Sequence, residues 1–147
     1  MAELADLPID CYTTGNHVWD KKEGIELLDR EPRLLRPANY PEGNPGKGVY
    51  VGETAAGVPV AILNLEGRVF MSHLDSPFRV ADRLLADLPR DVKVTMIDFH
   101  ADATSEKQAL AFHLTAASAP SSAPTPTSPP PTSASSPAAP PCSPTSA

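Results

Sequence analysis

The C-terminal segment of the chain limits how much of the sequence can fold. From Thr115 to Ala147 the sequence contains only Ala, Ser, Thr and Pro with one Cys, and it holds ten of the chain's 18 prolines. Such a segment buries too little apolar surface to offset the entropy of ordering its backbone, about 1–2 kcal/mol per residue. We therefore predict a folded domain over residues 1–114 and a disordered tail over residues 115–147.

Charge and apolar patterning exclude several classes of protein. The formal net charge of -6 lies wholly in the first 114 residues, and no cluster of Lys and Arg suggests a broad nucleic-acid-binding face. No run of 18 apolar residues predicts a membrane span. Cys11 and Cys142 form no disulfide framework, so we expect a cytoplasmic protein. The sequence carries no signal for the oligomeric state.

Strand and helix patterns alternate along the chain, which predicts an α/β fold. The predicted strands cover residues 9–13, 34–36, 48–53, 58–65 and 92–99. Helices are expected over residues 21–29 and 105–112, and a third is expected to begin after Ser76. The Gly- and Pro-rich residues 37–48 predict a loop. The strand over residues 92–99 is almost continuously apolar, which predicts burial on both faces.

Two short motifs follow predicted strands and carry the polar side chains of interest. They are TGNHVWD, residues 14–20, and DFHAD, residues 98–102. Open α/β sheets bind ligands at the carboxyl ends of their strands. The nitrogen and oxygen donors of Asn16, His17 and His100 suit borderline transition metals. The two motifs together therefore predict a metal-dependent site.

Each candidate residue also has a structural interpretation. Taken singly, His17 and His100 are better explained as hydrogen-bonded structural histidines, and only their joint context favours chemistry. Asp20 either orients its loop or caps the helix that starts near Lys21. Arg36 either contacts a phosphate or pairs with a carboxylate.

Four motifs carry a resemblance to a known family. GNHVWDKKE, LLRPANYPEGNPGKG, AILNLEGRVF and DFHADATSEK, in this order and at these spacings, resemble the YmdB-type branch of the calcineurin-like metallophosphoesterases over residues 4–114. The resemblance implies an αββα sandwich, two bound iron, manganese or zinc ions, and hydrolysis of small phosphodiesters such as 2′,3′-cyclic nucleotides. It maps Asn16 and His100 onto metal ligands and leaves His17 as the general acid or a phosphate contact. It assigns no substrate-binding residue.

The resemblance also implies motifs that this sequence lacks. The family places Gly-Asp-Val and Gly-Glu-Asn motifs before GNH, and a Gly-Thr-His-Thr-His segment after the position of Leu114. Reading the tail codons one nucleotide earlier permits that last segment, so we expect residues 115–147 to be a frame-shifted product. The alternative to an enzyme is a catalytically inactive fragment or pseudogene product. A genuine polyproline II interaction segment ranks last, because the tail has no flanking charge.

Overall fold

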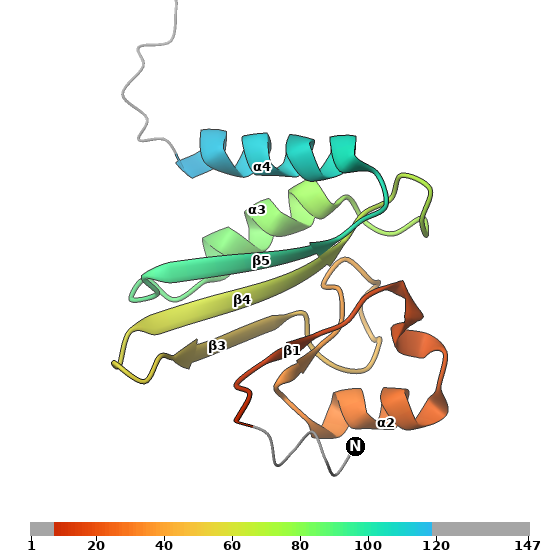
Figure 1. The fold of residues 1–147 in the computed structure, drawn as a ribbon, viewed down its shortest axis with the longest axis horizontal. Coiled ribbons are helices and arrows are strands. Elements are labelled where there is room, and N and C mark those ends of the chain that lie inside the picture. Colours follow the sequence, from red (N-terminus) through yellow and green to blue (C-terminus); the bar gives the residue numbers. More distant parts are fainter. Residues whose placement is uncertain (1–7, 119–147) are drawn as a thin grey trace, which may run out of the picture.

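A three-stranded sheet organises the protein, whose computed structural model describes residues 8–118 (Figure 1). The elements in chain order are β1 (Tyr12–Thr13), η1 (Asn16–Trp19), α2 (Lys22–Arg30), β2 (Leu34–Leu35), β3 (Val49–Glu53), β4 (Pro59–Glu66), α3 (Pro77–Asp87), β5 (Val94–His100) and α4 (Thr104–Ser118). The tail predicted to be disordered falls, beyond Ser118, outside the described residues. The alternating order confirms the predicted α/β class.

The main sheet has the strand order β3-β4-β5. β3 and β4 form the predicted antiparallel hairpin, whose turn places Gly57 at φ 71°. β4 and β5 are parallel, and their register runs from Val60 opposite Val94 to Glu66 opposite His100. A second, parallel pair consists of the two-residue strands β1 and β2. Two sheets are therefore present, as expected for a sandwich, but the second is small.

Helices α3 and α4 cover one face of the main sheet. The buried core joins Leu65 of β4 to Val80 and Ala81 of α3 and to Leu110 of α4. His113 Nε2 and Asp82 Oδ1 lie 2.8 Å apart and connect the two helices. Figure 1 shows α4, α3 and the three strands following one another from top to bottom, with α2 beyond them.

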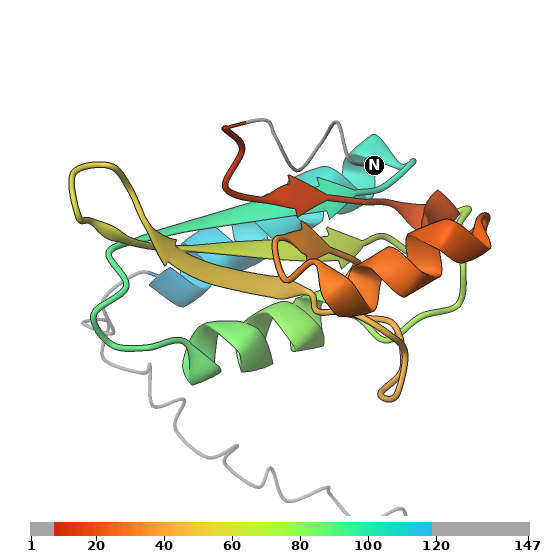
Figure 2. The ribbon, with the colours of Figure 1, turned by 90° about the horizontal axis from the view of Figure 1, so that it is seen from below.

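The opposite face of the sheet carries polar side chains near the carboxyl ends of its strands. Alternation places Asn64 and Glu66 of β4 on the same face as His100 of β5. The Asn64 amide Nδ2 donates hydrogen bonds of 2.8 Å and 3.2 Å to the carbonyl oxygens of Thr14 and Leu35. These bonds hold the β1–β2 pair against this face, and Figure 2 shows β1 and α3 on opposite sides of the sheet.

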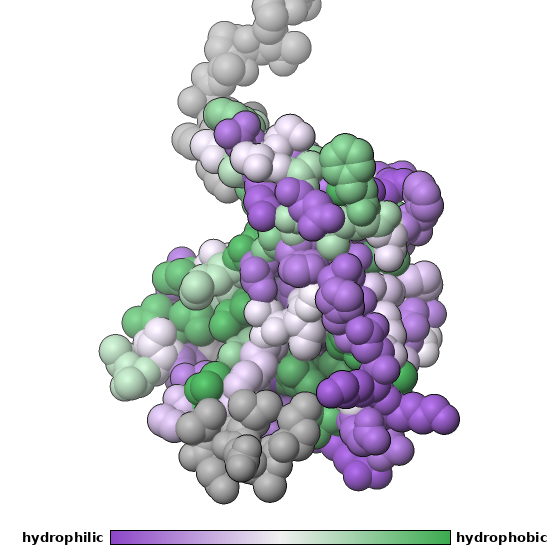
Figure 3. All heavy atoms as spheres, turned by 45° about the vertical axis from the view of Figure 1, so that its right-hand side comes forward, coloured by the Kyte–Doolittle hydropathy of each residue, from purple (hydrophilic) through white to green (hydrophobic). Residues whose placement is uncertain are grey.

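The predicted burial of β5 on both faces is wrong. Val94, Thr95 and Met96 are exposed, and only Ile97 and Phe99 are partly buried. Within residues 8–118, β5 is the edge of the main sheet, and the short β1–β2 pair covers little of the face opposite the helices. Apolar surface gathers on the left of Figure 3 and polar surface on its right.

Helix α4 is longer than the sequence pattern predicts. The helix runs to Ser118, so residues 115–118 are helical and not part of a disordered tail. Ala116 and Ala117 have the highest helix propensity, and the first proline of the tail comes only at position 120. Among the described residues, no helix has the length and apolar composition needed to cross a membrane.

Asn39 is the buried side chain that connects β4 to the segment before α3. Its Nδ2 donates hydrogen bonds of 2.8 Å and 3.1 Å to the carbonyl oxygens of Glu66 and Asp75. Its Oδ1 accepts a 2.9 Å hydrogen bond from the Glu66 backbone N–H. The Asn39 side chain therefore pairs with the edge of β4 that faces away from β5, at residues that β3 does not reach.

We expect Asn39→Ala to lower the free energy of unfolding by about 2–4 kcal/mol, because it leaves the N–H and C=O of the buried Glu66 and the C=O of Asp75 without their side-chain partner. Asn44→Ala is the matched control, since the Asn44 amide makes one exposed hydrogen bond, to the Pro41 carbonyl at 2.8 Å. The control should change stability by less than about 0.5 kcal/mol. Urea unfolding followed by circular dichroism measures both, and equal effects would contradict the role given to Asn39.

Candidate active site at the strand ends

The structure brings Asn16 and His100 together, although they are 84 positions apart in the sequence. Asn16 begins η1 directly after the β1 segment, and His100 is the last residue of β5. Asn16 Oδ1 and His100 Nε2 lie 3.0 Å apart. Two of the three predicted site residues therefore meet at the carboxyl ends of their strands.

Gly15 makes this approach possible. A Cβ atom at position 15 would lie 2.6 Å from His100 Nε2 and 2.7 Å from its Cδ2, closer than such atoms pack. The Gly15 backbone is extended, with φ -121°, so the need for glycine here is steric and not conformational. The glycine of the GNH motif thus lets the imidazole rest directly on the backbone beside Asn16.

His17 lies on the same short helix and is oriented by Asp20. His17 Nδ1 and Asp20 Oδ2 are 2.9 Å apart, and the two side chains are 81% and 62% exposed. Lys21 is the residue that precedes α2, and no side chain caps that helix. Of the two predicted roles for Asp20, capping is wrong, and orientation of the loop stays a prediction. An Nδ1–H donated to Asp20 leaves His17 Nε2 to exchange protons with a ligand.

Glu66 lies beside this pair and was not singled out by the sequence analysis. Its side chain is fully buried, and neither carboxylate oxygen accepts a hydrogen bond of regular geometry. Burial raises the pKa of Glu66, and the nearby Tyr40 hydroxyl and His100 imidazole oppose this shift. A glutamate within an apolar strand was the only sequence signal that could have identified it.

Tyr40 lies next to Glu66, and Trp19 packs on Tyr40. Trp19 and Tyr40 pack edge to face, with ring centroids 5.2 Å apart. Burial, followed by the charge of Glu66, raises the pKa of the Tyr40 phenol. This packing connects η1 to the Gly- and Pro-rich loop on the side of the site where Glu66 lies.

Arg36 binds backbone carbonyl groups of the Gly- and Pro-rich loop, so both of its predicted roles are wrong. Its guanidinium donates hydrogen bonds to three backbone carbonyl oxygens, those of Pro37, Pro45 and Asn44, at 2.9, 3.0 and 3.4 Å. Arg36 is buried, and this burial lowers its pKa. The arginine thus supplies hydrogen-bond donors to carbonyl groups of a loop that has no regular secondary structure.

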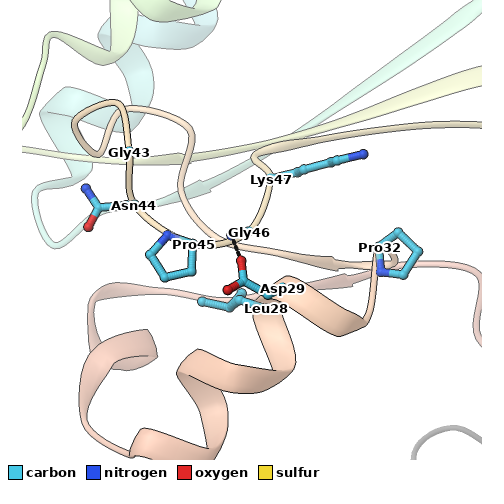
Figure 4. A pocket seen from close by; sticks show the side chains of 8 residues that line it. All are labelled: Leu28, Asp29, Pro32, Gly43, Asn44, Pro45, Gly46 and Lys47. Carbon is cyan, nitrogen blue, oxygen red and sulfur yellow. Dashed lines mark hydrogen bonds between the residues drawn. The ribbon is translucent and has the colours of Figure 1, made fainter.

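A cavity of about 600 Å³ lies on the other side of this loop (Figure 4). It is lined by residues of α2 and of the loop, among them Leu28, Asp29 and Lys47. Asp29 accepts a 3.2 Å hydrogen bond from the Gly46 N–H, and Lys47 points away from that contact in Figure 4. The cavity shares no lining residue with the Asn16–His100 pair. Its walls are explained by the packing of the loop onto α2.

The donors at Asn16 and His100 fit a metal ion. Two ligand atoms about 2.1 Å from one ion and at right angles to each other lie about 3 Å apart, which agrees with the 3.0 Å between Asn16 Oδ1 and His100 Nε2. An amide oxygen with an imidazole nitrogen suits borderline divalent metals. Within residues 8–118, no three His, Cys, Asp or Glu side chains form a group suited to a metal.

Comparison with known proteins identifies the family. The fold is an α/β domain with a candidate site at its strand ends, and the sequence profile of the YmdB-like proteins matches residues 1–119. The chain belongs to the YmdB-like family, as its motifs predicted. A Bacillus subtilis relative, a 2′,3′-cyclic-nucleotide 2′-phosphodiesterase, is 51% identical over 105 residues, which are 71% of this chain and 39% of the relative. A putative phosphatase/phosphodiesterase from Mycoplasma genitalium is 32% identical over 114 residues, 72% of this chain and 39% of that protein.

Solved structures agree with the fold. A hypothetical protein from Thermus thermophilus superposes with a TM-score of 0.69 and 42% identity, covering 76% of this chain and 42% of that one. A phosphatase from Mycoplasma pneumoniae superposes with a TM-score of 0.66 and 30% identity, covering 76% and 41% of the two chains. The chain thus spans about two fifths of the length of the relatives it matches.

We expect Gly15→Ala to displace His100 from Asn16, because the new methyl group would overlap the imidazole. The NMR signals of the His100 ring should shift, and the protein should lose about 1–3 kcal/mol of stability. Gly24→Ala is the control: Gly24 lies in α2, and its Cβ would meet only Val18 O at 3.6 Å. That change should be neutral or stabilise by up to about 1 kcal/mol. Unperturbed His100 signals in Gly15→Ala would refute the steric argument.

We expect Arg36→Met to destabilise the protein by about 2–3 kcal/mol, because it removes the donors of three loop carbonyls from a buried position. Arg30→Met should have an effect below about 0.5 kcal/mol, since Arg30 is 78% exposed and its nearest contact, with Glu26, is 3.9 Å long. Thermal unfolding compares the two variants. A stable Arg36→Met protein would mean that the loop orders without its arginine.

Proposed function

We propose that this protein acts on phosphodiesters through a metal centre of which Asn16, His17 and His100 are part, with 2′,3′-cyclic nucleotides as the substrate class. The observation that carries the proposal is the 3.0 Å approach of Asn16 to His100 beside an exposed His17. The name of the Bacillus subtilis relative supports the substrate class. The substrates are small, in keeping with the absence of Lys and Arg clusters from the sequence.

Asn16 and His100 are the proposed metal ligands. Two iron, manganese or zinc ions, when bound, would supply an activated water and neutralise the phosphoryl oxygens. Asn16 contributes a neutral oxygen, which its η1 position holds at the strand end. His100 contributes a ring nitrogen, which the end of β5 and the bare backbone of Gly15 hold in place.

His17 is the proposed general acid. Its Nδ1 contacts Asp20 Oδ2 at 2.9 Å, which orients the ring and leaves Nε2 without a contact to Asp20. A protonated ring would donate its Nε2 proton to the leaving oxygen of a phosphodiester. The high exposure of His17 leaves room for a nucleotide above it.

A second candidate function is that of a non-catalytic chain that binds one ion. The geometry favours it because Asn16 and His100 approach each other closely enough to share a single ion. In either case we propose a cytoplasmic location, in keeping with the free Cys11 thiol and with the lack of a membrane-spanning helix in the described part of the chain.

We expect the chain alone to hydrolyse bis-p-nitrophenyl phosphate and 2′,3′-cyclic AMP only slowly with Mn²⁺, because Asn16 and His100 provide donors for one ion, whereas the binuclear reaction needs two. A colorimetric and a chromatographic assay, each with and without EDTA, measure the rates. Fast hydrolysis that EDTA and His17→Ala both abolish would show instead that the chain holds a complete centre.

A chimera tests the enzyme proposal separately. In it, the residues of this chain replace the matched 105-residue segment of the Bacillus subtilis relative. We expect EDTA-sensitive hydrolysis of 2′,3′-cyclic AMP, reduced at least about 100-fold by His17→Ala and unchanged by His73→Ala, whose residue is exposed and outside the site. A folded but inactive chimera would favour the non-catalytic alternative.

A further inference from the structure

We propose that the Glu66 carboxylate is the anionic donor of the cation site at Asn16 and His100. The inference rests on the function proposed above and adds to it a residue from a third element, the end of β4. It makes the site of this chain a three-donor site, with an amide oxygen, an imidazole nitrogen and a carboxylate oxygen for one divalent cation.

The buried carboxylate of Glu66 has no charged partner that would offset its burial. A buried carboxylate is costly unless it is paired or binds a cation. Glu66 is 0% exposed, and neither of its carboxylate oxygens accepts a hydrogen bond of regular geometry, although the Tyr40 hydroxyl lies nearby. No Lys or Arg forms an ion pair with it among the described residues. A bound cation would supply the charged partner that the Glu66 carboxylate lacks.

Glu106 shows that the fold satisfies a buried carboxylate that has a structural role. Glu106 of α4 is 7% exposed, and its oxygens accept three hydrogen bonds from the backbone N–H groups of Arg68 and Val69, at 3.0 to 3.2 Å. These bonds attach the segment after β4 to α4. Glu66, only two residues before Arg68, has no corresponding donors.

The register of β4 and β5 places Glu66 next to His100. Glu66 and His100 are paired neighbours on parallel strands, so their side chains leave the same face of the sheet about 5 Å apart. The pairing continues past this point, because the Gly67 N–H donates a 2.9 Å hydrogen bond to the His100 carbonyl. Since His100 contacts Asn16, the three side chains are neighbours in the order Glu66, His100, Asn16.

The Glu66 backbone is held in place independently of the Glu66 side chain. Asn39 pairs with both the N–H and the C=O of Glu66, at 2.9 Å and 2.8 Å. The Glu66 side chain therefore extends from a fixed main chain, and its carboxylate lies near Tyr40. A mixed set of carboxylate, amide and imidazole donors suits manganese, iron and zinc.

The test is a Zn²⁺ titration of the full chain, labelled with ¹³C at the glutamate carboxyl carbons and with ¹⁵N in the histidine rings. In the unmodified protein we expect the Glu66 carboxyl and His100 ring signals to shift together with one dissociation constant. In Glu66→Gln the His100 signals should shift only at Zn²⁺ concentrations at least about tenfold higher, because a charged donor is replaced by a neutral one.

Glu106→Gln is the matched control, because it removes the same charge from a buried glutamate in the neighbouring segment. Its dissociation constant for Zn²⁺ should equal that of the unmodified protein. If Glu66→Gln binds Zn²⁺ as tightly as Glu106→Gln, or if the Glu66 carboxyl signal does not move in the unmodified protein, the inference is overturned and the proposed function stands. If Zn²⁺ moves neither Glu66 nor His100 in the unmodified protein, both proposals fail.

The ¹³C measurement also covers the case in which Glu66→Gln does not fold, because it requires no substitution. Amide spectra without Zn²⁺ show whether each variant is folded. A signal shift at Glu66 that appears at the same Zn²⁺ concentration as the shift at His100 supports the inference. Shifts at widely different concentrations contradict it, since they would mean two separate ions.

Discussion

The parallel pairing of β4 with β5 is the constraint on which the rest of the structure depends. It places His100 at the same end of the sheet as Glu66, and it directs Leu65, Ile97 and Phe99 to α3 and α4. Through Asn64 the same strand β4 holds the β1–β2 pair, and with it the segment that leads to Asn16. A shift of the register by one residue would turn each of these side chains to the wrong face.

The sequence predicted the elements well where local pattern decides them. The hairpin of β3 and β4, the helix after Ser76 and the loop over residues 37–48 follow from alternation, a first-turn proline and dense glycines. Burial was predicted less well. The apolar composition of β5 indicated a covered strand, but composition does not reveal how much of the neighbouring sheet is present to cover it.

The candidate site was predicted in part, for a related reason. Asn16 and His100 stand in strand-end motifs, which short-range pattern can find, and the structure brings them together. Arg36 and Asp20 were open between two roles, because a side chain's partner depends on packing that sequence spacing does not fix. Glu66 was missed because its sequence signal, a glutamate at the end of an apolar strand, fits an exposed strand end as well as a buried one.

Asn39 has a consequence for how this site can change over time. Because its amide holds the main chain of residue 66 on both sides, the position of the strand end does not depend on which side chain stands there. The main chain at position 66 therefore keeps its place when the side chain changes. A single substitution of similar size would change the charge at the proposed cation site, while the scaffold that positions the histidine and the amide stays the same.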